Sequence, residues 1–257
     1  MANNFDKNWT TVNNNYPLND KEVERYISVK PSANQLALVD KPFYTFMHFG
    51  MNTATDREWG AGVEKATDFT IKSVNAKQWV ETAKSAGATG VILTCKHHDG
   101  FCLWPSEYTS FCVKNSSYKG DIVKEVSDEC HKQGMDFGVY LSPWDMHDER
   151  YGTDAYNDYF CNQLTELLTN YGEIFEVWFD GAKGSNAKKF EYDWQRYYDL
   201  IRKLQPKANI AICGPDIRWV GNEEGKSRKS EYSVVPCDLR EADRIMALSQ
   251  QDANQAA

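Results

Sequence analysis

The sequence Ile174-Phe175-Glu176-Val177-Trp178-Phe179-Asp180-Gly181 contains the clearest fold signal in this chain. Five of the six residues before Asp180 are apolar, which predicts a buried strand of a parallel sheet. A carboxylate at the carboxyl end of such a strand, followed by Gly181, lies where α/β enzymes place their catalytic groups. The same Asp180 could instead cap the next loop or helix, so its neighbours must decide between the two interpretations.

Further strands of this kind recur along the chain, mostly with helices between them. We expect the other strands at 43–49, 90–95, 135–141, 208–213 and 232–235, and helices at 76–86, 121–132, 156–171 and 190–204. This alternation is typical of a βα repeat, which forms either a barrel or an open doubly wound sheet. No Gly-rich phosphate loop follows the first strand, so the barrel is favoured.

The predicted fold class is therefore α/β, a (β/α)8-type TIM-like barrel. Six strands are counted where a complete barrel has about eight, so the barrel is expected to be incomplete at its C-terminal end. We expect three regions: a polar N-terminal segment at 1–35, a partial catalytic barrel domain at 36–245, and a disordered or truncated tail at 246–257.

Composition excludes several classes of partner. The net charge is -8 and the basic residues are scattered, which argues against nucleic acid and anionic membranes. The chain has 8 Trp and 14 Tyr, and aromatic rings pack well on the apolar faces of sugars. Its seven Cys show no CxxC pair, and its start lacks a signal-peptide core. We expect a cytoplasmic location for the chain as written, or a periplasmic or secreted one if a leader is missing.

Polar and aromatic side chains follow every predicted strand from the first to the fifth. They are His48, with Glu58 and Trp59 in the loop after it; His97 and His98; Tyr140; Trp178 and Asp180; and Glu223 with Glu224 beyond the fifth strand. An isolated histidine at a strand end is more often structural. A purely structural explanation of the whole set is much weaker, because the carboxyl ends of barrel strands meet at one mouth.

Two chemistries could use this set. His48, His97, His98 and a carboxylate could bind zinc or a similar ion. Barrel metallohydrolases, however, usually carry His-x-His on the first strand, and adjacent His97 and His98 would point in opposite directions if their strand continued. Glycoside hydrolysis instead needs two carboxylates, donors for sugar hydroxyls and an aromatic platform. The residues favour the glycosidase, with no metal and no cofactor.

Five motifs occur in order along the chain: Phe46-Met47-His48-Phe49-Gly50, Glu58-Trp59, Lys96-His97-His98-Asp99-Gly100-Phe101, Tyr140-Leu141-Ser142 and Val177-Trp178-Phe179-Asp180-Gly181. Together they cover about residues 40–235 and resemble the α-L-fucosidases of glycoside hydrolase family 29. The resemblance implies a retaining enzyme that removes terminal α-linked fucose from a fucosylated oligosaccharide or glycoconjugate. It makes no prediction of oligomeric state.

The resemblance also implies roles for individual residues. Asp180 corresponds to the nucleophile, and the fucose pocket corresponds to His48, Glu58, Trp59, His97, His98, Tyr140 and Trp178. The sequence Arg-Trp-Val-Gly-Asn-Glu at 218–223 resembles the branch of the family that cleaves α-1,3/1,4-linked fucose, which makes Glu223 the acid/base. Glu224 is the fallback, and two solvated loop glutamates remain the alternative.

The C-terminal end departs from the family pattern. Family members usually continue through the remaining barrel strands and often into a β-sandwich domain, whereas this chain ends in a polar tail, as if truncated. The alternative function is therefore a catalytically weak or inactive fucose-binding remnant of such an enzyme. A metal-dependent barrel hydrolase is the less favoured third hypothesis.

Overall fold

The computed structural model describes residues 19–184 and 190–219 of the 257-residue chain. Its centre is a parallel sheet of five strands, hydrogen-bonded in chain order: β1 (Thr45–Met47), β2 (Gly90–Lys96), β3 (Asp136–Leu141), β4 (Glu176–Phe179) and β5 (Asn209–Ile212). Each of them overlaps a strand predicted from the sequence, although β1 is shorter than the predicted range 43–49. The predicted sixth strand at 232–235 lies outside the described residues.

The helices between the strands also agree with the sequence. They are α4 (Ala76–Ser85), α5 (Ile122–Lys132), α6 (Ala155–Asn170) and α7 (Trp194–Leu204), with α3 (Met51–Thr55) and the 3-10 turns η2 (Ala66–Asp68) and η3 (Val113–Asn115) in the loops. The prediction that the last helix begins at residue 190 is wrong. The side chain of Asp193 accepts a hydrogen bond from the amide of Arg196, and this cap begins α7 at Trp194.

Three helices were not predicted: α1 (Asp20–Ile27), α2 (Ala33–Val39) and the short α3 in the loop after β1. Ser32 and Gln35 form a reciprocal capping box at the start of α2. Asn34 then donates hydrogen bonds to the carbonyl oxygens of Pro206 and Ala208, which ties α2 to the start of β5. The expected domain boundary at residue 36 falls inside α2. No helix in the described ranges is both long and apolar enough to cross a membrane.

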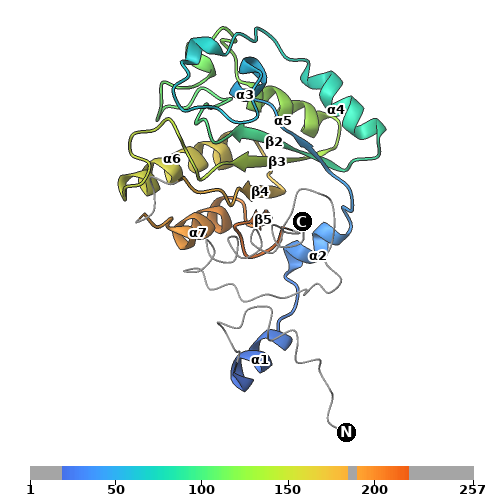
Figure 1. The fold of residues 1–257 in the computed structure, drawn as a ribbon. Helices are drawn as coiled ribbons and strands as arrows, with labels where there is room; N and C mark the ends of the chain where they lie inside the picture. Colours follow the sequence, from blue (N-terminus) through green and yellow to red (C-terminus); the bar gives the residue numbers. More distant parts are fainter. Residues whose placement is uncertain (1–18, 185–189, 220–257) are drawn as a thin grey trace, which may run out of the picture.

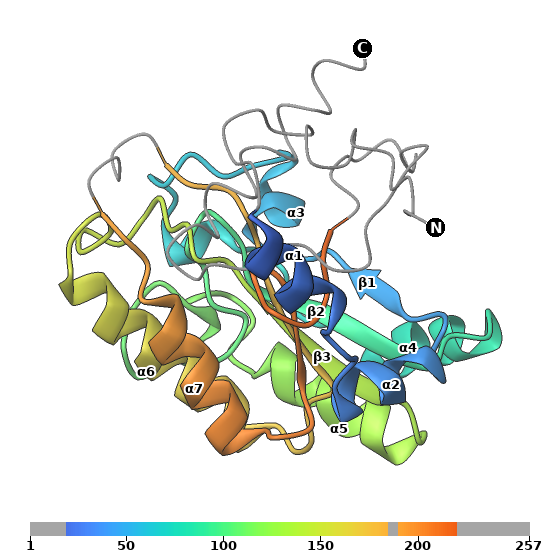
Figure 2. The ribbon, with the colours of Figure 1, turned by 90° about the horizontal axis from the view of Figure 1, so that it is seen from below.

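The strand order distinguishes the two architectures that the sequence left open. A doubly wound sheet reverses its strand order at a switch point and carries helices on both faces. Here β1 to β5 follow one another without reversal, and α4, α5, α6 and α7 cover one face (Figures 1 and 2). The arrangement is that of part of a TIM-like barrel, in which β1 and β5 are the outer strands of the described sheet.

Up to the register shift near the end of β2, side chains along the strands alternate between the two faces of the sheet. Val91, Leu93, Val139 and Val177 join the large core beneath the helices. On the other face the smaller cluster contains Ile92, Tyr140 and Phe175, with Leu38, Tyr44 and Trp178 packed against it. On this second face the register pairs Phe46 with Ile92, and Tyr140 with Trp178. The ring of Phe46 packs edge-on against the rings of Tyr140 and Trp178, and this contact joins the two pairs.

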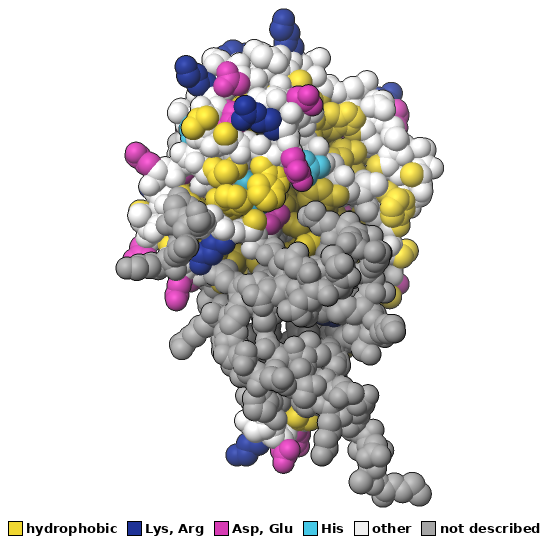
Figure 3. Space-filling view, viewed as in Figure 1, with side chains coloured by type: hydrophobic (Ala, Val, Ile, Leu, Met, Phe, Trp, Pro, Cys, Tyr) yellow, Lys and Arg dark blue, Asp and Glu magenta, His cyan; other side chains and the backbone are white. Residues whose placement is uncertain are grey.

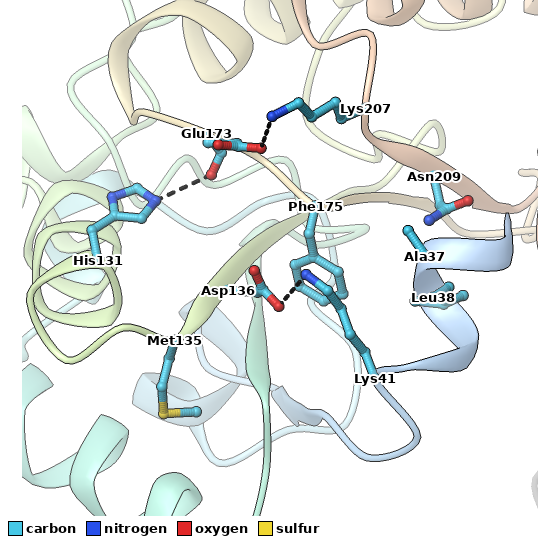
Figure 4. Close-up of a pocket in the computed structure, with 10 residues that line it drawn as sticks. All are labelled: Ala37, Leu38, Lys41, His131, Met135, Asp136, Glu173, Phe175, Lys207 and Asn209. Atoms are coloured by element: carbon cyan, nitrogen blue, oxygen red, sulfur yellow. Dashed lines mark hydrogen bonds and ion pairs between the residues drawn. The ribbon is translucent and has the colours of Figure 1, made fainter. Parts of the chain in front are cut away.

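A cavity of about 190 Å³ lies at the end of the sheet where β3, β4 and β5 begin (Figure 4). Its wall includes Asp136, Phe175 and Asn209, and Lys41 forms an ion pair with Asp136 beside it. None of the site residues predicted from the sequence lines this cavity. The predicted site lies instead at the opposite end of the sheet, beyond the carboxyl ends of the strands.

Candidate active site

Asp180 directly follows β4 and is held through both of its carboxylate oxygens. The hydroxyl of Tyr140 donates a hydrogen bond to Oδ2 at 2.9 Å, and the backbone N–H of Ala182 donates to Oδ1 at 2.8 Å. The sequence left open whether Asp180 is a cap or a catalytic group, and the structure allows both, since Oδ1 caps the following turn and Oδ2 faces the site. The side chain is 25% exposed, so the carboxylate remains open to a ligand.

Three histidines line up beside this carboxylate. Nε2 of His98 lies 3.9 Å from Oδ2 of Asp180, the His97 and His98 ring centroids are 4.1 Å apart, and those of His48 and His97 are 4.6 Å apart. Adjacent His97 and His98 face the same site because β2 ends at Lys96, so strand alternation does not extend to them. A turn follows at once, closed by the hydrogen bond from Gly100 N–H to the His97 carbonyl.

The end of β2 is fixed by a buried cation. The register between β2 and β3 shifts between Thr94 and Lys96, and the ammonium of Lys96 enters the core beneath α6. There Nζ lies 3.0 Å from Oδ2 of Asp145, 3.0 Å from Oε1 of Gln163 and 3.3 Å from the hydroxyl of Tyr156. These contacts fix the position of Lys96 at the end of β2, and the chain turns directly after it, which places His97 and His98 at the site.

The electrostatics keep the three imidazoles neutral. Burial lowers the pKa of His97 to about 2, with a further contribution from the neighbouring His98 and His48. Burial also lowers the pKa of His98 and of His48, in each case against the opposing effect of the Asp180 charge. A neutral imidazole has one N–H donor and one lone-pair acceptor, which suits the hydroxyl groups of a sugar.

Aromatic rings form the walls around the carboxylate and the histidines. Trp178 lies 5.2 Å from Tyr140 between ring centroids, and Phe46 packs edge-on against both. On the other side Trp59 and Trp144 pack against the His98 ring. Figure 3 shows a group of hydrophobic side chains on this view of the molecule, with histidine and carboxylate side chains among them. Trp59 is 54% exposed and Phe46 is 41% exposed, so apolar surface is available to a ligand.

Of the predicted residues, seven come together: Asp180, His48, His97, His98, Tyr140, Trp178 and Trp59. Glu58 lies in the same loop as Trp59, and its backbone carbonyl accepts a hydrogen bond from Asn52. Within the described part of the chain its exposed carboxylate makes no hydrogen bond or ion pair. Glu223 and Glu224 lie outside the described residues.

Four residues at the site were not singled out by the sequence reasoning: Phe46, Asn52, Ser142 and Trp144. Phe46 and Ser142 could have been found by strand alternation, because each stands two residues from a predicted site residue, His48 and Tyr140 respectively. Asn52 and Trp144 come from a helix and a loop, where no such periodicity exists. Among the described residues, no three His, Cys, Asp or Glu side chains are grouped so that they could hold a metal ion.

A comparison with protein-family models matches residues 47–238 to the family described as Alpha-L-fucosidase. The matched range contains His48 and every other predicted site residue. The chain belongs to the α-L-fucosidase family.

Relatives and solved structures agree with this membership. The chain is 49% identical to Alpha-L-fucosidase 1 of Arabidopsis thaliana over 209 residues, which cover 79% of this chain and 41% of the plant protein. A glycoside hydrolase 29 family member from an unknown rumen bacterium has a TM-score of 0.75 and 44% identity, over 83% of this chain and 42% of that one. A Ruminococcus gnavus GH29 fucosidase in complex with fucose has a TM-score of 0.72 and 37% identity, over 80% and 48%.

This α-L-fucosidase family chain therefore spans less than half the length of each of these three relatives. The described sheet, with its five parallel strands, agrees with a partial family 29 barrel.

Proposed function

We propose that this chain carries the nucleophile side of a retaining α-L-fucosidase that hydrolyses terminal α-linked fucose by double displacement. The main support is the position of Asp180, whose Oδ2 faces the site while Tyr140 and the Ala182 amide hold the carboxylate. Family membership and the fucose bound by the Ruminococcus gnavus relative support the same substrate. The substrate is then a fucosylated oligosaccharide or glycoconjugate.

In this proposal Asp180 attacks the anomeric carbon and forms a covalent glycosyl-enzyme, which water later hydrolyses. Attack requires a carboxylate whose orientation is set before the substrate arrives. The two hydrogen bonds to Asp180 come from a buried strand residue and from the backbone of the next turn, and both are rigid elements. The neutral histidines bind sugar hydroxyls, while Trp59 or Trp178 packs against the C6 methyl side.

The second carboxylate in this proposal is Glu223, with Glu224 as the fallback. It protonates the leaving oxygen in the first step and deprotonates water in the second. Retaining glycosidases place the two carboxyl groups about 5 Å apart, and Glu223 would have to reach that distance from Asp180. Support comes only from the 218–223 sequence, which resembles the α-1,3/1,4-specific branch; the same resemblance is the basis for proposing that linkage.

The test is hydrolysis of an aryl α-L-fucoside by the full chain and by Asp180→Ala. We expect the variant to fold, to lose turnover, and to regain part of it with azide through a product of inverted configuration. Asp128→Asn is a matched control, because Asp128 is an exposed carboxylate on α5 whose one partner among the described residues is Lys124. Full activity of Asp180→Ala would refute the assignment.

The variant Glu223→Ala distinguishes the role of the acid/base from that of the nucleophile. Loss of an acid catalyst harms substrates with poor leaving groups most, so an aryl fucoside with a good leaving group should suffer less than a natural glycan. Equal losses on both substrates would transfer the role to Glu224 or to another residue. Trisaccharides carrying α-1,3- and α-1,4-linked fucose, compared with an α-1,2-linked disaccharide, test the proposed linkage.

The second candidate function is a fucose-binding remnant with little or no turnover. The observation that favours it is the pocket itself, since neutral histidines and the exposed Trp59 bind a sugar whether or not Asp180 reacts. Calorimetric binding of fucose without hydrolysis of the aryl fucoside would support this candidate over the enzyme. A chelator that abolishes activity would instead favour the metal-dependent hydrolase.

A further inference from the structure

We propose that Asn52 and Ser142 are positioning residues that hold His48 and His98 in opposite tautomers. The pocket then presents one imidazole N–H donor and one imidazole lone pair. The tautomers follow from hydrogen bonds within the chain alone, whereas their use in recognising neighbouring sugar hydroxyls rests on the proposed function.

The tautomer of His48 is set by the side-chain amide of Asn52. Its Nδ2 lies 3.2 Å from the carbonyl oxygen of Glu58 and 3.3 Å from Nδ1 of His48. A carbonyl oxygen can only accept, so the group that faces it must be the NH2 of Asn52. That NH2 has two hydrogens, and the second points to Nδ1 of His48. Nδ1 therefore accepts, and in a neutral ring the proton resides on Nε2.

The tautomer of His98 is set in the opposite sense by Ser142. The Ser142 hydroxyl lies 2.7 Å from the backbone carbonyl oxygen of Trp144 and 2.7 Å from Nδ1 of His98. A hydroxyl has a single hydrogen, and the Trp144 carbonyl can only accept it. The lone pairs of Ser142 then face Nδ1 of His98, which must carry the proton. Nε2 of His98 is left as an acceptor, 3.9 Å from Oδ2 of Asp180.

The surroundings support a rigid rather than an exchanging arrangement. Ser142 is fully buried and His98 is 3% exposed, so water does not compete for the bond between them. The ring of His98 is also packed between Trp59 and Trp144. Asn52 is 6% exposed and belongs to α3, where its amide spans the gap between His48 and the loop that carries Trp59.

This pairing has a consequence for recognition. Two histidines of the same tautomer would offer a sugar either two donors or two acceptors. With opposite tautomers, Nε2–H of His48 donates to one hydroxyl oxygen, and Nε2 of His98 accepts the hydrogen of another. A hydroxyl that donates to His98 also places its hydrogen away from Asp180, whose Oδ2 already accepts a hydrogen bond from the Tyr140 hydroxyl.

The direct test is nuclear magnetic resonance of the full chain labelled with 15N-histidine, using long-range 1H–15N correlations that distinguish the two tautomers. The chain has only five histidines, and His48→Gln and His98→Gln assign the two signals of interest. We expect the Nε2–H pattern for His48 and the Nδ1–H pattern for His98 at a pH where both rings are neutral. The opposite pattern at either residue would overturn the proposal for that residue.

Two variants test whether Ser142 and Asn52 set the tautomers of His98 and His48. Ser142→Ala removes the acceptor of Nδ1–H, so the His98 signal should change to a mixture or to the Nε2–H form, with kcat/KM reduced about 10-fold or more. Asn52→Asp replaces the donor with an acceptor of the same shape, so His48 should change to the Nδ1–H form. If either variant fails to fold, the tautomers of the unmodified chain and the other variant still decide the question.

Matched controls separate positioning from a general loss of structure. Ser127→Ala removes another fully buried hydroxyl, one that donates a hydrogen bond to the Lys124 carbonyl within α5, and should change neither the histidine signals nor kcat/KM. Unchanged tautomers in Ser142→Ala and Asn52→Asp would refute the positioning role. The expected tautomers in a chain that hydrolyses no fucoside would contradict the proposed function and leave the tautomer assignment intact.

Discussion

The hydroxyl of Tyr140 donates a 2.9 Å hydrogen bond to Oδ2 of Asp180, joining β3 to the end of the neighbouring β4. Burial, and then the Asp180 charge, hold the pKa of Tyr140 well above its usual range. The phenol therefore keeps its proton and remains a donor at neutral pH. A donor fixed in this way both orients the carboxylate and stabilises its charge.

Tyr140→Phe should lower kcat for an aryl fucoside about 10- to 100-fold, because a hydrogen bond to a charged group contributes about 1.5–3 kcal/mol. KM should change less, since the ring and its packing on Trp178 remain. Steady-state kinetics measure both constants. Tyr118→Phe is the control, because Tyr118 also donates to a carboxylate, Glu125, but does so away from the site. Equal effects of the two variants would contradict the role given to Tyr140.

Glu176 predicts a pH dependence of stability. Its side chain is fully buried on β4, neither oxygen has a hydrogen-bond partner of regular geometry among the described residues, and burial raises its pKa from 4.5 to about 7. The folded state therefore binds the proton more tightly than the unfolded state. The contribution of Glu176 to stability should be fully present below pH 4.5, fall between pH 4.5 and about 7, and then level off.

Glu176→Gln should flatten this part of the profile, with a gain on the order of 3 kcal/mol at pH 8 and little gain at pH 4.5. Urea unfolding at the two pH values measures it. Glu173→Gln, at an exposed position just before β4, is the control and should leave the profile unchanged. A pH dependence that persists in full in Glu176→Gln would assign it elsewhere, with buried Asp99, whose pKa is also raised to about 7, as the first residue to examine.

The buried pair of Lys96 and Asp145 should be sensitive to the loss of one partner. Lys96→Met leaves the Asp145 charge in the core, and removing one partner of a buried ion pair typically costs about 3–5 kcal/mol. Adding Asp145→Asn to Lys96→Met should recover part of this loss, although Asp145 also accepts hydrogen bonds from two backbone amides. The exposed pair Lys124–Asp128 is the control, where Lys124→Met should cost below about 1 kcal/mol. Equal losses of stability in Lys96→Met and Lys124→Met would contradict the assignment of Lys96–Asp145 as a buried ion pair that is sensitive to the loss of one partner.

Gly60 holds the loop of Glu58 and Trp59 against the turn after β2. A Cβ at this position would lie 2.4 Å from the Cβ of Asp99, a distance that requires one backbone segment to move. Gly60→Ala should therefore displace Trp59, raise KM several-fold and destabilise the fold by about 1–3 kcal/mol. Gly87→Ala is the comparison, since its Cβ meets no atom within 4 Å and only its positive φ opposes the change. That variant should cost about 1 kcal/mol without affecting KM.

The periodic parts of the fold were predictable from the sequence. All five strands and the four helices between them were expected close to their observed positions, because apolar periodicity reflects burial on one face or both. The helices α1 and α2, of eight and seven residues, were missed because the start of the chain was interpreted as a polar segment without secondary structure. The start of α7 was predicted too early because buried aromatic residues continue into the segment before the Asp193 cap.

Most residues of the site were predictable from the sequence, but the hydrogen bonds between them were not. Strand-end position selected Asp180, Tyr140 and the three histidines, because parallel strands bring their carboxyl ends to one edge. Alternation suggested that His97 and His98 would point apart, and this expectation did not apply because β2 ends at Lys96. The role of Ser142 depends on a hydrogen bond to His98, 44 residues away in the chain, which no local pattern encodes. The role of Asn52 depends on how the loop backbone folds back to place the Glu58 carbonyl, which strand alternation does not predict.

The sequence by itself determined a parallel α/β sheet with Asp180 at the end of a buried strand, since both follow from local apolar runs and where they stop. The tertiary structure decided what holds that carboxylate and which nitrogen of each histidine faces the ligand. The physical reason is that hydrogen-bond direction depends on atoms brought together by folding, such as Tyr140 with Asp180 and Ser142 with His98.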